Sequence, residues 1–493
     1  MMTVVAVESA EEPKEGICQS REVPVLRSST ATEDGLEDSP QTLRRGFQIF
    51  GTKVRAMKKK ESNMGQIERG IAQESRELLR EAMRDVAQAR ADACPPVCPV
   101  CGTRLQDTRI EERTIRSQWG EITLKRTYGY CPECLRWLAP ADVELGLEGH
   151  ESNTPAFGEM MSYLGTKVPM SEAAEILEHI TGEKVAPSRV ERETKRTAEK
   201  ALAVREKDVE RALSPTERHE FAREQEGRLP EGHFTLVILM DGWMMRERDD
   251  WGCTEAMRAA GRNPERWHEV KTGRYYLIES NDWHEGSRPS LAGSGYLATR
   301  LDAEGFSELV WTEAVRYGIQ KADRVLVISD GGVWIWKIVE DRFSFADKEL
   351  DFYHASQHLW VVSNALHGEG TEEAREWVEP LLHQMRHGGE AGVIQTLSDL
   401  HEIIKDQKTR EVVRREHEYF EKHRDHMAYQ ERAKRGEPLG SGAVESAAKR
   451  YQVRFKRGGQ FWSRTWDEGL LHLKSLQLSG RWNELWPFLH QEN

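Results

Sequence analysis

Three carboxylates stand where strands and a helix could bring them together. Asp241 follows the apolar run LVILM, Asp330 follows the run VLVIS, and Glu445 lies in the small-residue segment GSGAVESAAKR. A run of strand-forming residues that ends in Asp-Gly predicts a buried strand that delivers a carboxylate to a sheet edge. Neighbouring carboxylates are not all ionised without cations, and hard divalent ions such as Mg²⁺ are their natural partners. Because paired metals carry out phosphoryl transfer, the pattern predicts an enzyme that cuts and joins nucleic acids.

Glu445 is expected in the first turns of a helix. The Gly-Ser-Gly sequence at residues 440–442 allows a tight entry into that helix. A negative charge suits the N-terminus of a helix, and small neighbours let the helix approach a sheet closely. Taken singly, an aspartate at a strand end more often caps a turn, so the interpretation rests on all three carboxylates together.

Two C-x-x-C pairs predict a metal site of another kind. CPVCG and CPEC are turns of the type that supplies the tetrahedral thiolate shell of Zn²⁺, here with Cys98, Cys101, Cys131 and Cys134. The segment between the pairs alternates polar and apolar residues around Trp119 and Gly120, which predicts a β-hairpin. We therefore expect a zinc ribbon with one structural zinc, because all four ligand positions are filled. The other cysteines are expected to be free thiols.

The total charge argues mildly against a nucleic-acid partner, but the distribution of charge does not. The chain of 493 residues has a formal net charge of −13. Binding to nucleic acid follows local basic patches more than the total. The segment KRYQVRFKRGG, directly after Glu445, carries five cations that are candidates for phosphate contacts: Lys449, Arg450, Arg454, Lys456 and Arg457. A solvated helix face explains this cluster equally well from the sequence alone.

A second candidate for DNA contact lies upstream. The pattern SEAAEILEHITG predicts a helix that stops at Gly182, and another helix begins near Pro187. Two helices joined by a glycine-containing turn suggest a helix-turn-helix, whose second helix carries Arg189, Arg192 and Lys195. Helical hairpins without any DNA contact are common, so this alternative stays open.

The order of these patterns predicts a multidomain α/β protein. Strands are expected in FTLVILMDG, GRYYLIES and ADRVLVISDGG, and the segment VWIWKIVEDRF with the following DFYHASQHLW is expected to be a strand end that runs into a helix. The predicted parts are a disordered segment (1–60), a helix (61–94), a zinc ribbon (95–150), a helical, helix-turn-helix-like DNA-binding region (151–228), a catalytic core (229–370 and 436–493) and a helical insertion (371–435). No apolar stretch is long enough to span a bilayer and the N-terminus lacks an export pattern, so a cytoplasmic, nucleoid-associated protein is expected.

The motifs also carry a resemblance to a known family. In chain order, the motifs ISDGGVWIW, DFYHASQHL, GSGAVESAAKR, RFKRGGQFW and LSGRW resemble those of bacterial insertion-sequence transposases of the DDE type. The ISKra-type group, which also places paired C-x-x-C turns upstream, is the nearest in pattern, and the resemblance covers roughly residues 98–486. It implies an RNase H-like core, a mixed sheet flanked by helices, with Asp241, Asp330 and Glu445 as the triad. It also implies Asp351 and His354 as an accessory pair, although a histidine at the edge of the core explains His354 equally well.

The activity implied by this resemblance is DNA transposition. Such an enzyme binds the terminal inverted repeats of its element and a target DNA as a homo-oligomer, without any membrane. The triad would hold two catalytic Mg²⁺ ions, for which Mn²⁺ is a substitute, for strand cleavage and strand transfer. Two alternatives remain from the sequence: a plain RNase H-like nuclease, and a non-catalytic DNA-binding protein derived from a transposase.

Overall fold

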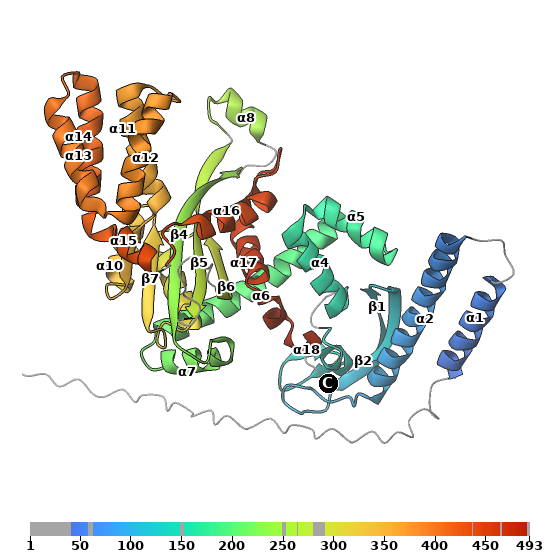
Figure 1. Ribbon diagram of the computed structural model, residues 1–493. Coiled ribbons are helices and arrows are strands. Elements are labelled where there is room, and N and C mark those ends of the chain that lie inside the picture. The colour runs from blue at the N-terminus through green and yellow to red at the C-terminus, as the bar shows by residue number, and fades with distance from the viewer. Residues whose placement is uncertain are drawn as a thin grey trace, which may run out of the picture. The chain divides into compact units, whose positions relative to one another are not determined.

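A mixed sheet of five strands forms the centre of the C-terminal part of the protein (Figure 1). Its strands are β4 (Phe234–Glu247), β5 (Arg266–Glu279), β6 (Leu291–Thr299), β7 (Arg324–Ser329) and β8 (Asp347–Leu350), in the spatial order β6-β5-β4-β7-β8. β4, β5 and β6 pair antiparallel, whereas β7 and β8 add in parallel on the other side of β4. Since β4 is covered on both faces, it is apolar almost without interruption as far as Met240.

The computed structural model describes residues 41–57, 63–147, 152–248, 253–263, 265–279, 291–435, 437–463 and 466–490. The chain divides into two compact units, Met1–Ala89 and Arg90–Asn493. Within the described residues, no helix is both long and apolar enough to cross a membrane.

Two different helical layers cover the sheet. On one face, Leu236, Ile238 and Met240 of β4 pack in a core shared with α9 (Ala303–Arg316) and α10 (Val333–Arg342). On the other face, Val237 and Leu239 pack with the helix α16 (Gly442–Phe455). The alternation of side chains along β4 therefore assigns every second residue to the α16 side.

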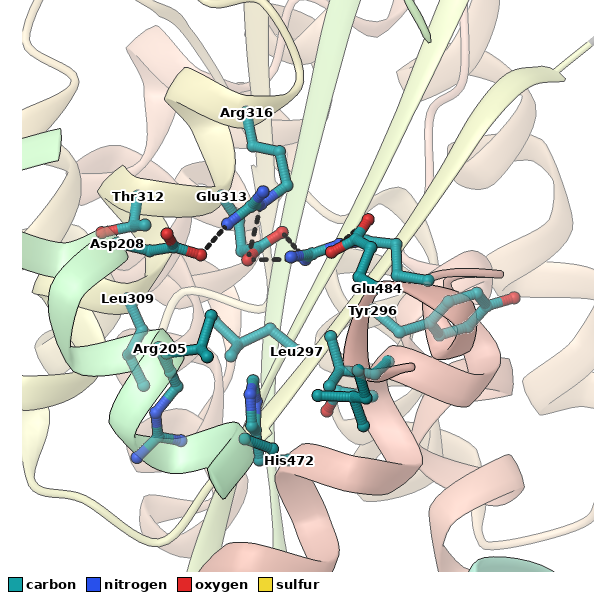
Figure 2. Close-up of a pocket in the computed structure, with 16 residues that line it drawn as sticks. Arg205, Asp208, Tyr296, Leu297, Leu309, Thr312, Glu313, Arg316, His472 and Glu484 are labelled. Atoms are coloured by element: carbon teal, nitrogen blue, oxygen red, sulfur yellow. Dashed lines mark hydrogen bonds and ion pairs between the residues drawn. The ribbon is translucent and has the colours of Figure 1, made fainter. Parts of the chain in front are cut away.

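A network of charged residues connects the helix α9, which packs on the sheet, to the upstream helix α6 (Figure 2). Arg316 of α9 contacts Asp208 of α6 (Pro187–Leu213) at 2.6 Å and Glu313 at 3.4 Å. Glu313 also accepts from Arg481 at 3.1 Å, and Arg481 reaches Glu484 at 3.0 Å. These side chains line a cavity of only about 40 Å³. These charged side chains pair with one another, and Arg205, which also lines the cavity, pairs with Glu468 at 2.5 Å. Buried charges need such partners, and we interpret this cavity as structural.

The region before Glu445 is a helical subdomain with a core of its own. It comprises α11 (Phe352–His367), α12 (Glu372–His387), α13 (Glu390–Ile403), α14 (Gln407–Lys422) and α15 (Tyr429–Lys434). Leu359, Val378, Leu397 and Phe420, one from each of the first four helices, are among the fully buried members of this core. The predicted insertion at residues 371–435 covers α12 through α15 but leaves out α11, which packs in the same core and was assigned to the catalytic core.

Upstream of the sheet lie a second, smaller sheet and a group of helices. β1 (Gln106–Ser117) and β2 (Gly120–Cys131) form the expected hairpin around Trp119, and β3 (Arg136–Leu138) adds to β2. The helices α4 (Pro155–Lys167), α5 (Met170–Thr181) and α6 follow, and α5 ends at Gly182 in the left-handed conformation, with φ of 72°. Further helices complete this region and the C-terminal region: α3 (Pro140–Glu144), α7 (Arg218–Glu224), α8 (Thr254–Ala259), α17 (Asp467–Leu478) and α18 (Pro487–His490).

Three sequence predictions need correction. Residues 41–57 are not disordered but form the helix α1 (Gln41–Met57). Lys53 of this helix pairs with Glu74 of α2 (Met64–Ala93) at 2.6 Å. The rest of the segment that was predicted to be disordered lies outside the described residues. β4 does not end at Asp241, because β5 pairs with it as far as Glu247. VWIWKIVEDR is the helix α10 and not a strand end, because its apolar residues recur at helical spacing against the sheet.

Candidate active site and cysteine cluster

Strand pairing brings Asp241 and Asp330 together. The parallel pairing of β4 with β7 ends at Met240 opposite Ser329, so the next residue on each strand is a carboxylate. Asp241 stands two residues from Leu239 and two from Trp243 along β4, so the three side chains share one face, and both Leu239 and Trp243 belong to clusters that include residues of α16. The side chain of Asp241 therefore belongs to the face of the sheet that α16 covers.

The third carboxylate comes from α16 itself. Val444 packs with Val237 and Leu239, whereas Ala447 and Ala448 pack with Trp243, so the first turns of α16 straddle the position of Asp241. Glu445 lies in that first turn and remains exposed. The structure thus brings the three predicted residues to one place from three segments that are far apart in the sequence.

Asp351 joins this group as a fourth carboxylate. It follows β8, is only 2% exposed, and caps α11 by accepting a hydrogen bond from the backbone N–H of Tyr353 at 2.7 Å. Ser441, at the start of α16, donates its hydroxyl to Asp351 and lies 3.4 Å from a carboxylate oxygen of Glu445. Asp351 therefore ties the start of the Glu445 helix to the end of the sheet.

The four carboxylates create a strongly negative environment. Burial raises the pKa of Asp241 to about 6, and the nearby charges of Asp330, Glu445 and Asp351 contribute to the rise. The backbone N–H of Gly242, which donates to Asp241 at 2.7 Å, acts in the opposite direction. Carboxylate oxygens gathered in a negative environment are the donor set that Mg²⁺ or Ca²⁺ requires. The oxygen atoms of these four carboxylates do not form one compact group of metal ligands. Among the described residues, the four cysteines form such a group.

His354 lies in the first turn of α11, and its neighbours were not predicted from the sequence. Its Nε2 is 3.4 Å from Nε2 of His358, whose Nδ1 is 2.5 Å from Glu416 of α14. The ring of Tyr419 stacks on His358 with a centroid separation of 3.7 Å. The helical spacing of residues 351, 354 and 358 could have identified His358 as a neighbour of His354. No pattern in the sequence marked Glu416 or Tyr419 as part of this group.

The four cysteines form the second candidate site. Their sulfur atoms lie within 4.8 Å of one another, with Cys98 3.8 Å from Cys134 and Cys101 3.4 Å from Cys131. Four sulfurs around a metal at about 2.3 Å are separated by about 3.8 Å, so the group is compatible with a structural zinc. Hydrogen bonds from Thr103 lower the pKa of Cys101 to about 6, whereas the hydrogen bond with Cys101 raises that of Cys134 to about 12.

The basic residues after Glu445 divide into two groups. Lys449, Arg450 and Lys456 are exposed on α16 and its C-terminal end. The prediction that Arg454 contacts DNA is wrong, because its side chain is 1% exposed and donates to the carbonyl of Gly165 at 3.0 Å. Arg457 is partly exposed and forms an ion pair with Glu172 of α5.

The residues predicted to contact DNA from the second helix of a helix-turn-helix lie at the start of α6. Arg192 and Lys195 are exposed, whereas Arg189 is half-buried and donates to Ser152 at 2.6 Å. Burial lowers the pKa of Arg189, and the charges of Arg116 and Arg192 lower it further, so cations of the hairpin and of α6 gather here. Lys195 forms an ion pair with Glu191 at 2.7 Å, within its own helix.

The raised pKa of Asp241 generates a prediction about stability. An ionised carboxylate whose folded-state pKa is raised from 3.8 to about 6 opposes folding. This cost is absent below pH 3.8, grows between the two values, and is complete above pH 6. Asp241→Asn should therefore raise the free energy of unfolding by about 1–3 kcal/mol at pH 7.5 and give no gain near pH 4. Urea unfolding without added divalent cations measures this difference.

Asp341→Asn, on the exposed end of α10, is the matched control and should change little at either pH. A loss of stability in Asp241→Asn at pH 7.5 would contradict the electrostatic account.

Comparisons with known proteins point to a family whose function has not been characterised. Residues 284–484 match the sequence model of the Uncharacterised protein family (UPF0236). A curated relative, "UPF0236 protein in vanSb 3′region" of Streptococcus gallolyticus, is 24% identical over 379 residues, covering 76% of this chain and 74% of that protein. The matched segment contains Asp330, Asp351, His354 and Glu445, whereas Asp241 lies upstream of it. The chain is thus similar to UPF0236 proteins across the part that supplies most of the carboxylate site.

Proposed function

We propose that this protein is a DDE-type transposase of a bacterial insertion sequence, of the ISKra-type group. It would bind the ends of its element, cut the DNA strand there and join the freed end to a target. The observation that carries the proposal is the meeting of Asp241, Asp330 and Glu445 on the α16 face of one mixed sheet. Asp241 and Asp330 each accept a backbone hydrogen bond in their turns, from Gly242 at 2.7 Å and from Gly332 at 3.0 Å. Asp241 nevertheless costs stability when it is ionised, so turn capping alone does not account for it.

The architecture supports an RNase H-like core. A mixed sheet carries helices on both faces, and a helical subdomain interrupts the chain between β8 and α16. This is the arrangement that the resemblance to DDE transposases implies. The 24% identical relative and the partial family match are compatible with this proposal, but neither describes an activity.

Asp241, Asp330 and Glu445 would hold two Mg²⁺ ions, or Mn²⁺ in their place. Bound Mg²⁺ would supply an activated oxygen nucleophile and neutralise charge at the phosphate. Burial and the neighbouring carboxylates raise the pKa of Asp241, so a bound cation would relieve the cost of its charge. Asp351 would act indirectly, because its hydrogen bond with Ser441 fixes the start of the helix that carries Glu445.

Cations beside the carboxylates would hold the DNA backbone. Lys449 and Lys456 are exposed on and just after the same helix as Glu445, so a phosphate chain along α16 would lead into the site. Local charge of this kind lets an acidic chain bind DNA.

The upstream regions would recognise the element ends. The four thiolates would hold one structural zinc, with no position left for a catalytic water. Arg189 and Arg192 at the start of α6, next to Arg116 of the hairpin, would contact the DNA. Double-stranded element ends and target DNA are the proposed partners of a nucleoid-associated, cytoplasmic homo-oligomer.

The central prediction concerns strand cleavage. Asp241→Asn, Asp330→Asn and Glu445→Gln should each lower the cleavage rate by roughly 10²–10³-fold or more while DNA binding persists. Duplexes that carry the DNA flanking this gene, with Mg²⁺ or Mn²⁺, are the substrate, and binding is measured in parallel. Asp341→Asn is the control and should cleave at the normal rate. Normal cleavage by Asp330→Asn would show that the triad is wrongly assigned.

A second prediction concerns the DNA path along α16. Replacing Lys449 and Lys456 together with glutamine should weaken binding to element ends and random duplex alike, because phosphate contacts carry no sequence information. The slope of log affinity against log salt should fall by roughly 2, since each phosphate contact contributes about 0.9. The double change Lys405→Gln and Lys408→Gln, at exposed positions of the helical subdomain, is the matched control. An unchanged salt slope in the α16 variant would place the DNA elsewhere.

A third prediction concerns zinc. The purified protein should contain one zinc per chain, and Cys131→Ser should lose it and unfold the hairpin region locally, because ligand binding supplies folding energy. Cys253→Ser, which changes an exposed cysteine outside the cluster, should keep its zinc. A correctly folded protein without zinc in elemental analysis would refute the assignment.

A further inference from the structure

We propose that Glu416, His358 and His354 form a hydrogen-bonded relay that enters the candidate active site from the helical subdomain. Glu416 and His358 are positioning residues, and His354 is the residue that they present to the site. The orientation of the histidines stands on the structure alone. The chemistry of the relay rests on the proposed function.

The relay begins at a buried carboxylate. Glu416 is 3% exposed on α14, and its two oxygens contact Nδ1 of His358 at 2.5 Å and the guanidinium of Arg415 at 2.6 Å. Burial raises the pKa of Glu416, but the hydrogen bonds from His358 and Arg415 outweigh it, so the pKa lies below its usual range. Glu416 is therefore ionised at neutral pH and acts only as an acceptor. His358 must carry its proton on Nδ1.

That choice of tautomer fixes the next link. When a neutral imidazole carries its proton on Nδ1, its Nε2 is an acceptor. Nε2 of His354 lies 3.4 Å from Nε2 of His358, so His354 is the donor there. Nδ1 of His354 is then left as an acceptor. One buried carboxylate thus sets the tautomers of two histidines in succession.

Tyr419 holds the middle of the relay in place. Its ring lies almost parallel to that of His358, at an interplanar angle of 15°, so it restricts the imidazole plane. Its hydroxyl has no hydrogen-bond partner in the described part of the chain, and a side chain on Gly331 would lie 3.1 Å from it. Gly331 follows Asp330, so the Tyr419 hydroxyl lies beside the turn that carries the second carboxylate.

Helix geometry directs the relay toward the carboxylates. Asp351, His354 and His358 stand at i, i+3 and i+7, which places them along one face of α11. Asp351 lies at the end next to Ser441 and Glu445, and Glu416 supports the other end. His354 is therefore between the carboxylate site and the residues that orient it.

The relay can move one proton without any redox partner. In phosphodiester cleavage, a water oxygen bonds to phosphorus, the bond from phosphorus to the 3′ oxygen breaks, and the water loses a proton. His354 accepts that proton on Nδ1 and passes its Nε2 proton to His358. His358 then carries protons on both ring nitrogens, and the ionised Glu416 stabilises this cation through its hydrogen bond with Nδ1. The 3′ oxygen takes its own proton from solvent, so the protons balance.

The first test reads the tautomers and needs no activity. Nitrogen NMR of the histidine-labelled, full-length protein distinguishes protonated from unprotonated ring nitrogens, and His354→Gln and His358→Gln identify the two signals. His358 should be protonated on Nδ1 in the wild type and lose that preference in Glu416→Gln. Glu418→Gln, an exposed change on the same helix, should leave both signals unchanged. An identical His358 tautomer in Glu416→Gln would overturn the relay.

The second test measures cleavage of duplexes carrying the flanking DNA. Glu416→Gln should lower kcat by roughly 10- to 100-fold with KM for DNA unchanged, whereas Glu418→Gln should match the wild type. An unchanged kcat in Glu416→Gln refutes a role of the relay in the reaction. Wild-type protein that cuts no DNA refutes the proposed function instead, and the tautomer measurement then decides the relay by itself.

Discussion

The packing of α16 against β4 is the contact on which the candidate site depends. Val444 anchors the helix among Val237 and Leu239, and the alanines one turn later let it lie close to Trp243. This apolar contact holds Glu445 over the position of Asp241, although like charges repel each other. Burial of apolar side chains, at about 1.5–3 kcal/mol for each large residue, is of the same order as the cost of keeping Asp241 ionised where it is buried beside other carboxylates. The hydrophobic layer is thus the support of the polar site.

The helical subdomain does more than separate β8 from α16 in the chain. It has a hydrophobic core of its own, and its helix α14 supplies Glu416 and Tyr419 to the edge of the site. Gly331 suits the turn after Asp330, because its φ of 93° favours glycine and a side chain there would lie 3.1 Å from the Tyr419 hydroxyl. Sheet and subdomain therefore constrain each other at the carboxylates.

The sequence was most informative where local pattern decides structure. Apolar runs located β4 and β7, small residues located the start of α16, and cysteine spacing located the thiol cluster. The course of β4 beyond Asp241 was missed because its continuation depends on a partner strand, β5, and not on its own residues. VWIWKIVEDR was misread because bulky and β-branched residues favour strands, whereas packing on the sheet made it helical.

Contacts between distant segments of the chain could not be predicted from the sequence. Glu416 and His358 are 58 residues apart, and nothing in either local sequence marks them as a pair. Arg454 looked like its basic neighbours, and its burial became evident only when α16 and α4 were seen together. Periodicity predicts which face of a helix is apolar, but it does not predict which basic side chain becomes buried in a contact with another helix.

The buried link from Arg454 to Gly165 has a mechanical consequence. It joins the helix of Glu445 to α4, and Arg457 pairs with Glu172 of α5, so polar contacts connect the three helices. If the connected helices move together, a protein that recognised DNA with one end of them and cut with the other would measure distance as a ruler does. Each base pair turns the duplex by roughly 34–36°, so a ruler of fixed length admits only one offset between a recognised sequence and a cut.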